Sequence, residues 1–248
     1  LGGAINELPL RWEETGASVS YQISSFPTHR VTLAGAYRHE PSGLLLSLES
    51  YYDYTKNDYE VDVEVPDERG RLYDARVKRF HDGYTANGVT LRAGFLERPW
   101  AKRLLLTAFT TGYDKELQHN IVMTVPYGEV EYGERVTGAN LQFEQDFTDK
   151  LSLDVDAAYA YGSIDFEDKS KWVYDWFGDQ VRERRVAGEI SGTAIDQSIW
   201  QHTTFARTML GYQFYPAHVL RASVSPQYFT RSGDEKIQAN TSERDPLT

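Results

Sequence analysis

Hydrophobic and polar residues alternate along many stretches of this chain. In residues 151–161 every second residue is apolar, and Ser152, Asp154 and Asp156 stand between the apolar positions. A period of two is typical of a β-strand with one apolar and one polar face. The carboxylates on the second face indicate that this face contacts water.

The same alternation predicts about nine strands, and no stretch of comparable length has the period of a helix. The predicted strands cover residues 17–24, 30–39, 44–54, 84–96, 103–113, 135–147, 151–166, 203–214 and 219–229. Most hold roughly 8–13 residues, which exceeds the usual five or six. A tilted strand needs about 9–11 residues to cross a membrane, so the lengths favour a membrane barrel.

The connections between these strands fall into two classes. In a meander, successive connections lie at alternate ends of the sheet. One end receives short segments rich in turn residues, at 39–43, 97–102, 147–150 and 215–218. The other end receives 26–29 and three long segments, at 55–83, 114–134 and 162–202. Outer-membrane barrels separate their loops in this way, with short periplasmic turns and long extracellular loops.

Charges recur on the polar parity of the predicted strands. They include Glu49, Arg92, Glu144, Asp146, Asp154, Asp156, Arg207 and Arg221. A dry core cannot hold so many charges without partners, whereas a water-filled lumen can. The apolar parity would then face lipid. The alternative is a water-soluble antiparallel sheet whose polar parity faces ordinary solvent.

Composition narrows the function. The chain has 248 residues, with 26 Lys and Arg against 37 Asp and Glu, and a net charge of -11. This balance argues against a nucleic-acid partner, which would require a basic face. The 17 tyrosines suit half-wet surfaces, and the absence of Cys excludes disulfides and thiolate metal sites. Since the chain begins at Leu1 with no signal peptide, we expect its ends to be cut points.

The first residues carry a resemblance to a known family. Residues 1–6 read LGGAIN, which resembles the last plug strand of TonB-dependent outer-membrane receptors. The segments SYQISSF (20–26), VTLAGAY (31–37) and FTDKLSLDVDAAYAY (147–161) are also similar to the family's early barrel. The resemblance implies that residues 1–12 end a plug domain and that residues 13–248 form an incomplete, antiparallel up-and-down transmembrane β-barrel.

The resemblance also implies a function. Such receptors lie in the outer membrane of Gram-negative bacteria and import scarce ligands, most often ferric siderophores, with energy from TonB. The implied partners are TonB, outer-membrane lipid and a small-molecule substrate such as a metal chelate. No enzymatic activity, catalytic residue, cofactor or nucleic-acid partner is expected. The alternatives are a passive porin or structural barrel, a barrel enzyme, and a secreted β-sandwich adhesin.

The longest loop holds the candidate ligand-binding residues. The segment KWVYDWFGDQ (171–180) is dense in aromatics, and Arg182 in the RERR segment that follows could pair with an anionic ligand. The candidates are Trp172, Tyr174, Trp176, Phe177 and Arg182. The aromatic residues could equally hold the loop against its neighbours or belong to an interfacial aromatic girdle. Acidic residues of the same loop could neutralise Arg182.

A second acidic segment invites a metal-site interpretation. In DYEVDVEVPDERG (58–70) carboxylates recur at alternate positions, and such hard oxygen ligands suit calcium. The EF-hand spacing is missing, so we favour the solvated face of a hairpin above the membrane. The six histidines show no metal-binding spacing, and the sequence contains no nucleophile-elbow, Walker A or dinucleotide-binding motif. No metal ligands are predicted.

Overall fold

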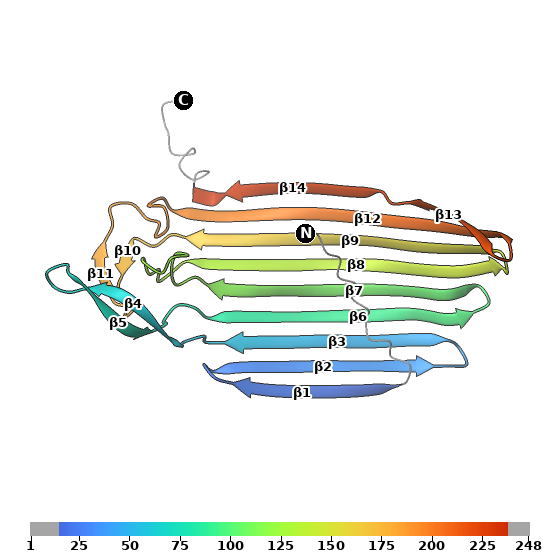
Figure 1. Cartoon of the computed structure of the whole chain (residues 1–248), viewed down its shortest axis with the longest axis horizontal. Helices are drawn as coiled ribbons and strands as arrows, with labels where there is room; N and C mark the ends of the chain where they lie inside the picture. The colour runs from blue at the N-terminus through green and yellow to red at the C-terminus, as the bar shows by residue number, and fades with distance from the viewer. Residues whose placement is uncertain (1–14, 238–248) are drawn as a thin grey trace, which may run out of the picture.

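The computed structural model describes residues 15–237, which form an all-β protein built on one large antiparallel sheet (Figure 1). The long strands are β1 (Gly16–Ser24), β2 (Thr28–His39), β3 (Leu44–Thr55), β6 (Tyr84–Arg98), β7 (Ala101–Glu116), β8 (Glu131–Thr148), β9 (Leu151–Asp168) and β12 (Ile195–Tyr215). The predicted plug end at residues 1–12 lies outside the described residues. No helix among the described residues is long and apolar enough to span a membrane.

A broken strand completes the sheet. β13 (His218–Val224) pairs with the C-terminal half of β12, and β14 (Gln227–Glu235) pairs with its N-terminal half. The register continues across the break, since Thr208 opposes Val224 and Phe205 opposes Gln227. Pro226 lies in the gap and has no N–H to donate to the ladder. The single strand predicted at 219–229 is therefore two collinear strands.

The strand order is that of a meander, β1-β2-β3-β6-β7-β8-β9-β12 followed by β13 and β14. All nine predicted strand positions are confirmed. Several strands extend further toward the long connections than predicted. For example, β12 begins at Ile195 instead of residue 203. β9 and β12 stay in register along the whole of β9, from Leu151 opposite Tyr212 to Asp168 opposite Ile195.

The separation of short and long connections is also confirmed. One end of the sheet carries the tight turns 40–43, 99–100, 149–150 and 216–217, and the other end carries 25–27, 56–83, 117–130 and 169–194. Two small hairpins rise from the long connections on the left of Figure 1. They are β4 (Glu60–Pro66) with β5 (Leu72–Lys78), and β10 (Trp172–Tyr174) with β11 (Gln180–Glu183).

The two faces of the sheet differ in chemistry along matched rows. In one row Leu46, Ala93, Leu106, Leu141 and Ala157 are successive cross-strand partners. The next row on the opposite face runs through Ser47, Arg92, Thr107, Asn140 and Ala158. We call these the apolar face and the polar face. The period-two pattern of each strand is therefore in phase across the sheet.

The apolar face is the more exposed of the two. Leu105 on the polar face is 7% exposed, whereas its neighbour Leu106 on the apolar face is 53% exposed. Ala86 on the polar face is similarly buried, while Leu91 on the apolar face is 53% exposed. In a water-soluble sheet the apolar face is the buried one. The exposure of the two faces is therefore the reverse of the exposure expected in water.

The apolar face changes character toward the long connections. Along β9 its residues are apolar from Leu151 to Tyr161 and then become Ser163, Asp165 and Glu167. The cross-strand neighbours change at the same level, since Asp114 and Gly133 share the row of Asp165. The apolar part of this face is therefore a band of limited height with a charged border.

Candidate functional site: the loop layer and the tyrosine strip

The five predicted ligand-binding residues lie in and around the β10–β11 hairpin. Trp172 and Tyr174 belong to β10, Arg182 belongs to β11, and Trp176 and Phe177 lie in the turn between the two strands. The structure places them in three different environments. Trp172, Phe177 and Arg182 are exposed, Tyr174 is partly exposed, and Trp176 is only 3% exposed.

Trp176 is a packing residue of the loop layer, by which we mean the segments 56–83, 117–130 and 169–194 together. Its ring contacts a buried cluster formed by Val63, Val65 and Val77 of the β4–β5 hairpin. Met123 packs against the same cluster. This core joins three segments that are distant in the sequence. The structure thus gives Trp176 the alternative role considered above, that of holding its loop against the neighbouring loops.

Further ring contacts join the same three segments. The ring of Tyr174 lies 6.1 Å from that of Phe80, centroid to centroid, and the Tyr174 hydroxyl donates to the Glu129 carboxylate. The rings of His119 and Trp176 are also 6.1 Å apart. Gly178, which has a positive φ of 90°, lies directly beneath Phe80, so a Cβ there would press on its ring.

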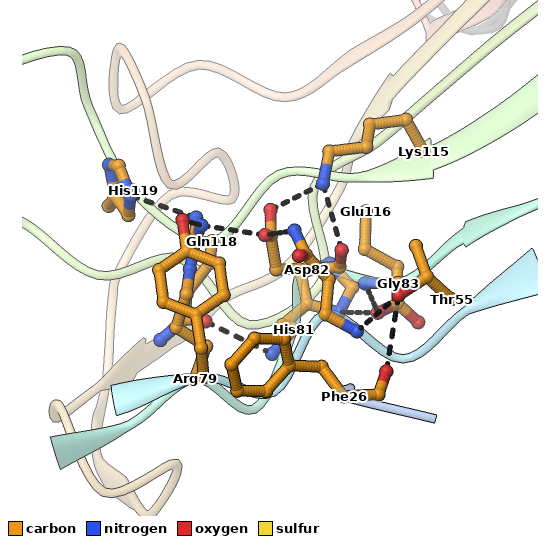
Figure 2. A network of polar contacts seen from close by, with 12 residues as sticks. Phe26, Thr55, Arg79, His81, Asp82, Gly83, Lys115, Glu116, Gln118 and His119 are labelled. Atoms are coloured by element: carbon orange, nitrogen blue, oxygen red, sulfur yellow. Dashed lines mark hydrogen bonds and ion pairs between the residues drawn. The ribbon is translucent and has the colours of Figure 1, made fainter. Parts of the chain in front are cut away.

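A buried ionic network anchors the loop layer to the sheet (Figure 2). The Asp82 carboxylate accepts from Arg79 Nη1 at 2.7 Å, from Lys115 Nζ at 2.5 Å and from the Asn57 amide. The side chains of Arg79 and Asp82 are only 9% and 4% exposed. Since Lys115 belongs to β7, this carboxylate ties the 56–83 segment to the end of a sheet strand. A buried charge with three partners is a fixed structural element.

The remaining bonds of Arg79 extend the network. Its Nη1 donates to the Tyr59 hydroxyl at 2.5 Å, its Nη2 lies 2.9 Å from His119 Nε2, and its guanidinium stacks on the Tyr59 ring. Nearby, His81 Nε2 lies 2.9 Å from the Val130 carbonyl oxygen, and Gln118 Oε1 accepts from the amide of Phe80. The 56–83 and 117–130 segments are therefore joined by several polar contacts as well as by packing.

Two buried carboxylates fix the third segment. Glu189 accepts from the amides of Gly128 and Glu129 through its two oxygens, at 2.8 and 2.9 Å. Asp168, at the end of β9, accepts from the amides of Glu189 and Ile190. Burial raises the pKa of the Glu189 carboxyl, although the two backbone donors oppose this effect. The carboxylates act here as caps for backbone N–H groups.

The acidic segment 58–70 includes β4 and the turn of the β4–β5 hairpin, so the predicted hairpin is present, although Asp58 is buried. Its carboxylates face basic side chains: Asp58 pairs with Lys78 at 2.7 Å, and Asp62 pairs with Arg76 at 2.8 Å. These contacts lower the pKa of both carboxyls. Within the described part of the chain, no group of His, Cys, Asp or Glu has the geometry of a metal site.

A group of tyrosines lies on the polar face just beneath the loop layer. We call Tyr51, Tyr84, Tyr113 and Tyr132 the tyrosine strip. The rings of Tyr84, Tyr113 and Tyr132 follow one another across β6, β7 and β8, at centroid distances of 5.7 and 5.8 Å. Tyr51 reaches from β3 across Gly88 to β7, where its hydroxyl bonds Thr111 Oγ1 at 2.5 Å. Only glycine at position 88 leaves room for this ring.

Glu134 joins two members of the strip. Its Oε2 accepts from the hydroxyl of Tyr113 at 3.2 Å and from that of Tyr132 at 3.3 Å. Within the described chain, Oε1 of Glu134 and the hydroxyl of Tyr84 take part in no hydrogen bond. Tyr51 is exposed, and Tyr84, Tyr113 and Tyr132 are partly exposed. The strip therefore offers aromatic faces together with unoccupied polar atoms.

No protein-family model matches the sequence, and no curated protein matches it.

Sequence reasoning missed the tyrosine strip and the buried carboxylates. A signal for the strip was present, because Tyr51 stands on the polar parity of its predicted strand beside Glu49 and Asp53. An aromatic residue among carboxylates is out of place on a purely solvated face. No comparable signal marks Asp82, Asp168 or Glu189, whose partners come from distant segments.

Proposed function

We propose that this chain belongs to a TonB-dependent outer-membrane receptor, which imports a scarce ligand into a Gram-negative bacterium with energy from TonB. On this proposal the described sheet is part of the transmembrane barrel. Its apolar face contacts lipid, its polar face lines the lumen, and the loop layer is extracellular. By the resemblance of the first residues, a ferric siderophore is the first candidate ligand.

The observation that carries the proposal is the exposure of the apolar face. Large side chains such as Leu91, Leu106 and Leu210 are 53%, 53% and 44% exposed. In water this contiguous surface would favour aggregation. In lipid the same surface is solvated, and the polar face is the one that must be kept from the bilayer.

The height of the apolar band agrees with a bilayer. From Leu151 to Tyr161 there are ten residue steps (161 − 151), which correspond to about 34 Å along the strand. At a tilt of about 45° this length spans roughly 24 Å, close to the apolar band of outer-membrane barrels.

Exposed aromatic residues near the two borders of the band further support a lipid environment. Tyr52, Tyr54 and Tyr161 stand toward the long connections, and Trp100, Phe147 and Phe214 stand toward the short turns. Aromatic girdles at both interfaces are a feature of transmembrane barrels. The opposite ends of the sheet then correspond to the two sides of the membrane.

The decisive experiment follows the whole protein in its own bacterium. We expect it in the outer-membrane fraction, and we expect uptake of its ligand to stop when TonB is deleted. Because the native sequence has no Cys, a cysteine at the fully exposed Ile121 should react with an impermeant reagent on intact cells, and one at Asp149 should not. Solute passage without TonB would favour a passive porin, and a soluble protein would refute the proposal.

A further inference from the structure

The geometry points to the tyrosine strip as a binding site for an uncharged, hydroxyl-rich ligand, namely a neutral oligosaccharide. This inference rests on the proposed function, because it places the ligand on the lumen wall just beneath the loop layer. Among the scarce ligands that such a receptor imports, the chemistry of this wall favours a neutral oligosaccharide over an anionic metal chelate.

The charges around the strip are already engaged with one another. Arg30 forms a two-bond pair with Asp53 at 2.7 and 3.0 Å, and Lys115 is held by Asp82. An anionic ligand would therefore have to compete with Asp53 for Arg30, whose side chain is 56% exposed, and with the buried Asp82 carboxylate for Lys115. Glu134 adds a carboxylate that would repel an anion. A neutral ligand meets neither penalty.

The polar atoms that remain suit hydroxyl groups. Glu134 Oε1 can accept a hydrogen bond, and the Tyr84 hydroxyl can both donate and accept one. The Glu134 carboxylate lies at the hydroxyl ends of Tyr113 and Tyr132, and the Tyr84 ring neighbours the Tyr113 ring. A sugar presents C–H groups on the faces of its ring and hydroxyls around its edge, so it can contact an aromatic face and bond these atoms at the same time.

The arrangement of the rings suits a chain of sugars better than a single one. Tyr84, Tyr113 and Tyr132 come from three successive strands, and their rings are neighbours. The hydroxyl of Tyr51, from β3, reaches Thr111, which lies two residues before Tyr113 in β7. The strip therefore crosses several strands of the wall. A ligand made of repeating units can contact successive rings in the same manner.

Isothermal titration of the whole receptor, purified from outer membranes in detergent, tests the inference. The probes are maltohexaose, cellohexaose and xylohexaose, with ferric citrate as the anionic chelate. We expect at least one oligosaccharide to bind and ferric citrate not to bind at this site. Tyr113→Ala and Tyr51→Ala should each weaken oligosaccharide binding by about tenfold.

The chain offers a matched control in Tyr52→Ala. Tyr52 follows Tyr51 in the same strand but lies on the apolar face, so its loss should leave binding unchanged. Tyr113→Phe keeps the ring and removes the hydroxyl, and it should bind more tightly than Tyr113→Ala. This variant keeps the test valid if an alanine variant does not fold, which heat-modified gel mobility reports.

The outcomes separate the inference from the proposed function. If no oligosaccharide binds, or if strip and control variants bind alike, the strip is only cross-strand packing and the inference is refuted. Binding of ferric citrate alone would refute the inference and leave the receptor proposal intact. If a bound oligosaccharide enters cells equally well without TonB, the binding site stands and the proposed function fails.

Discussion

The Arg79 guanidinium lies 2.7 Å from the Asp82 carboxylate, and the two side chains are among the most buried charged groups of the described chain. They stand three positions apart at the end of the long 56–83 segment, directly before β6 begins at Tyr84. Asp82 also holds Lys115 of β7. This pair is one of the points at which the loop layer is fastened to the sheet, together with Asp168 at the end of β9.

Replacement of this carboxylate should release the loop layer. Asp82→Ala leaves Arg79 and Lys115 without their buried partner, and breaking a buried pair in this way costs about 3–5 kcal/mol. Hydrogen exchange should show faster opening of the 56–83 segment. The matched control is Asp62→Ala, whose pair with Arg76 is 69% and 65% exposed and should contribute nothing measurable. Equal effects of the two changes would contradict this role.

Trp176 should matter for stability and its neighbour Phe177 should not. Trp176 is 3% exposed within the valine cluster of the β4–β5 hairpin, and Phe177 is 56% exposed. Trp176→Ala removes a large buried ring and should cost about 3–5 kcal/mol of local stability. Amide exchange at Val63 and Val77 reports the loss. If Phe177→Ala accelerates this exchange as strongly, the assignment of the cluster is wrong.

Glu189 should make the loop layer sensitive to pH. Burial raises the pKa of its carboxyl in the folded state, so the folded protein binds more protons than the unfolded one between the ordinary and the raised pKa. The contribution to stability is then greatest below the ordinary pKa and falls as pH rises through this window. Amide exchange at Gly128 and Glu129, corrected for intrinsic exchange rates, measures this change in local stability with pH.

The comparison for this pH effect is Glu189→Gln. The variant cannot ionise, so its loop stability should be flat across the same window, with a constant loss from the weaker cap on the two amides. Glu183→Gln on the exposed β11 strand is the matched control and should keep the wild-type profile. If the stability of the loop changed with pH in parallel in wild type and Glu189→Gln, the Glu189 carboxyl would not be the source of the pH dependence.

The sheet could be predicted from the sequence because its signal is local. A period of two can be read within each strand, and turn residues mark the short connections. The alternation was blurred at 103–113, where Leu105 and Leu106 are both apolar; the structure shows that they lie on opposite faces. Pairing with β6 and β8 places Leu105 on the polar face and Leu106 on the apolar face.

The loop layer could not be predicted in the same way because its contacts are not local. Val63 and Trp176 meet although more than a hundred positions separate them, and Glu189 caps amides at Gly128 and Glu129. The sequence placed an aromatic cluster at 171–180 but could not say which rings are buried. Trp176 is buried and Phe177 is exposed because of the way in which the three loops fold onto one another.

The two faces of β9 provide a final test. Val155 lies on the apolar face between Phe143 and Thr208, and Asp154 lies on the polar face between Glu144 and Met209. If the apolar face contacts lipid, Val155→Arg places a charge near the middle of the bilayer and should cost about 2–4 kcal/mol. Asp154→Ser should be tolerated, because its face is wet. Assembly of the whole protein into lipid vesicles, followed by gel mobility with and without heating, compares the two. Similar assembly yields would show that the two faces do not meet different solvents, and the membrane placement would then be wrong.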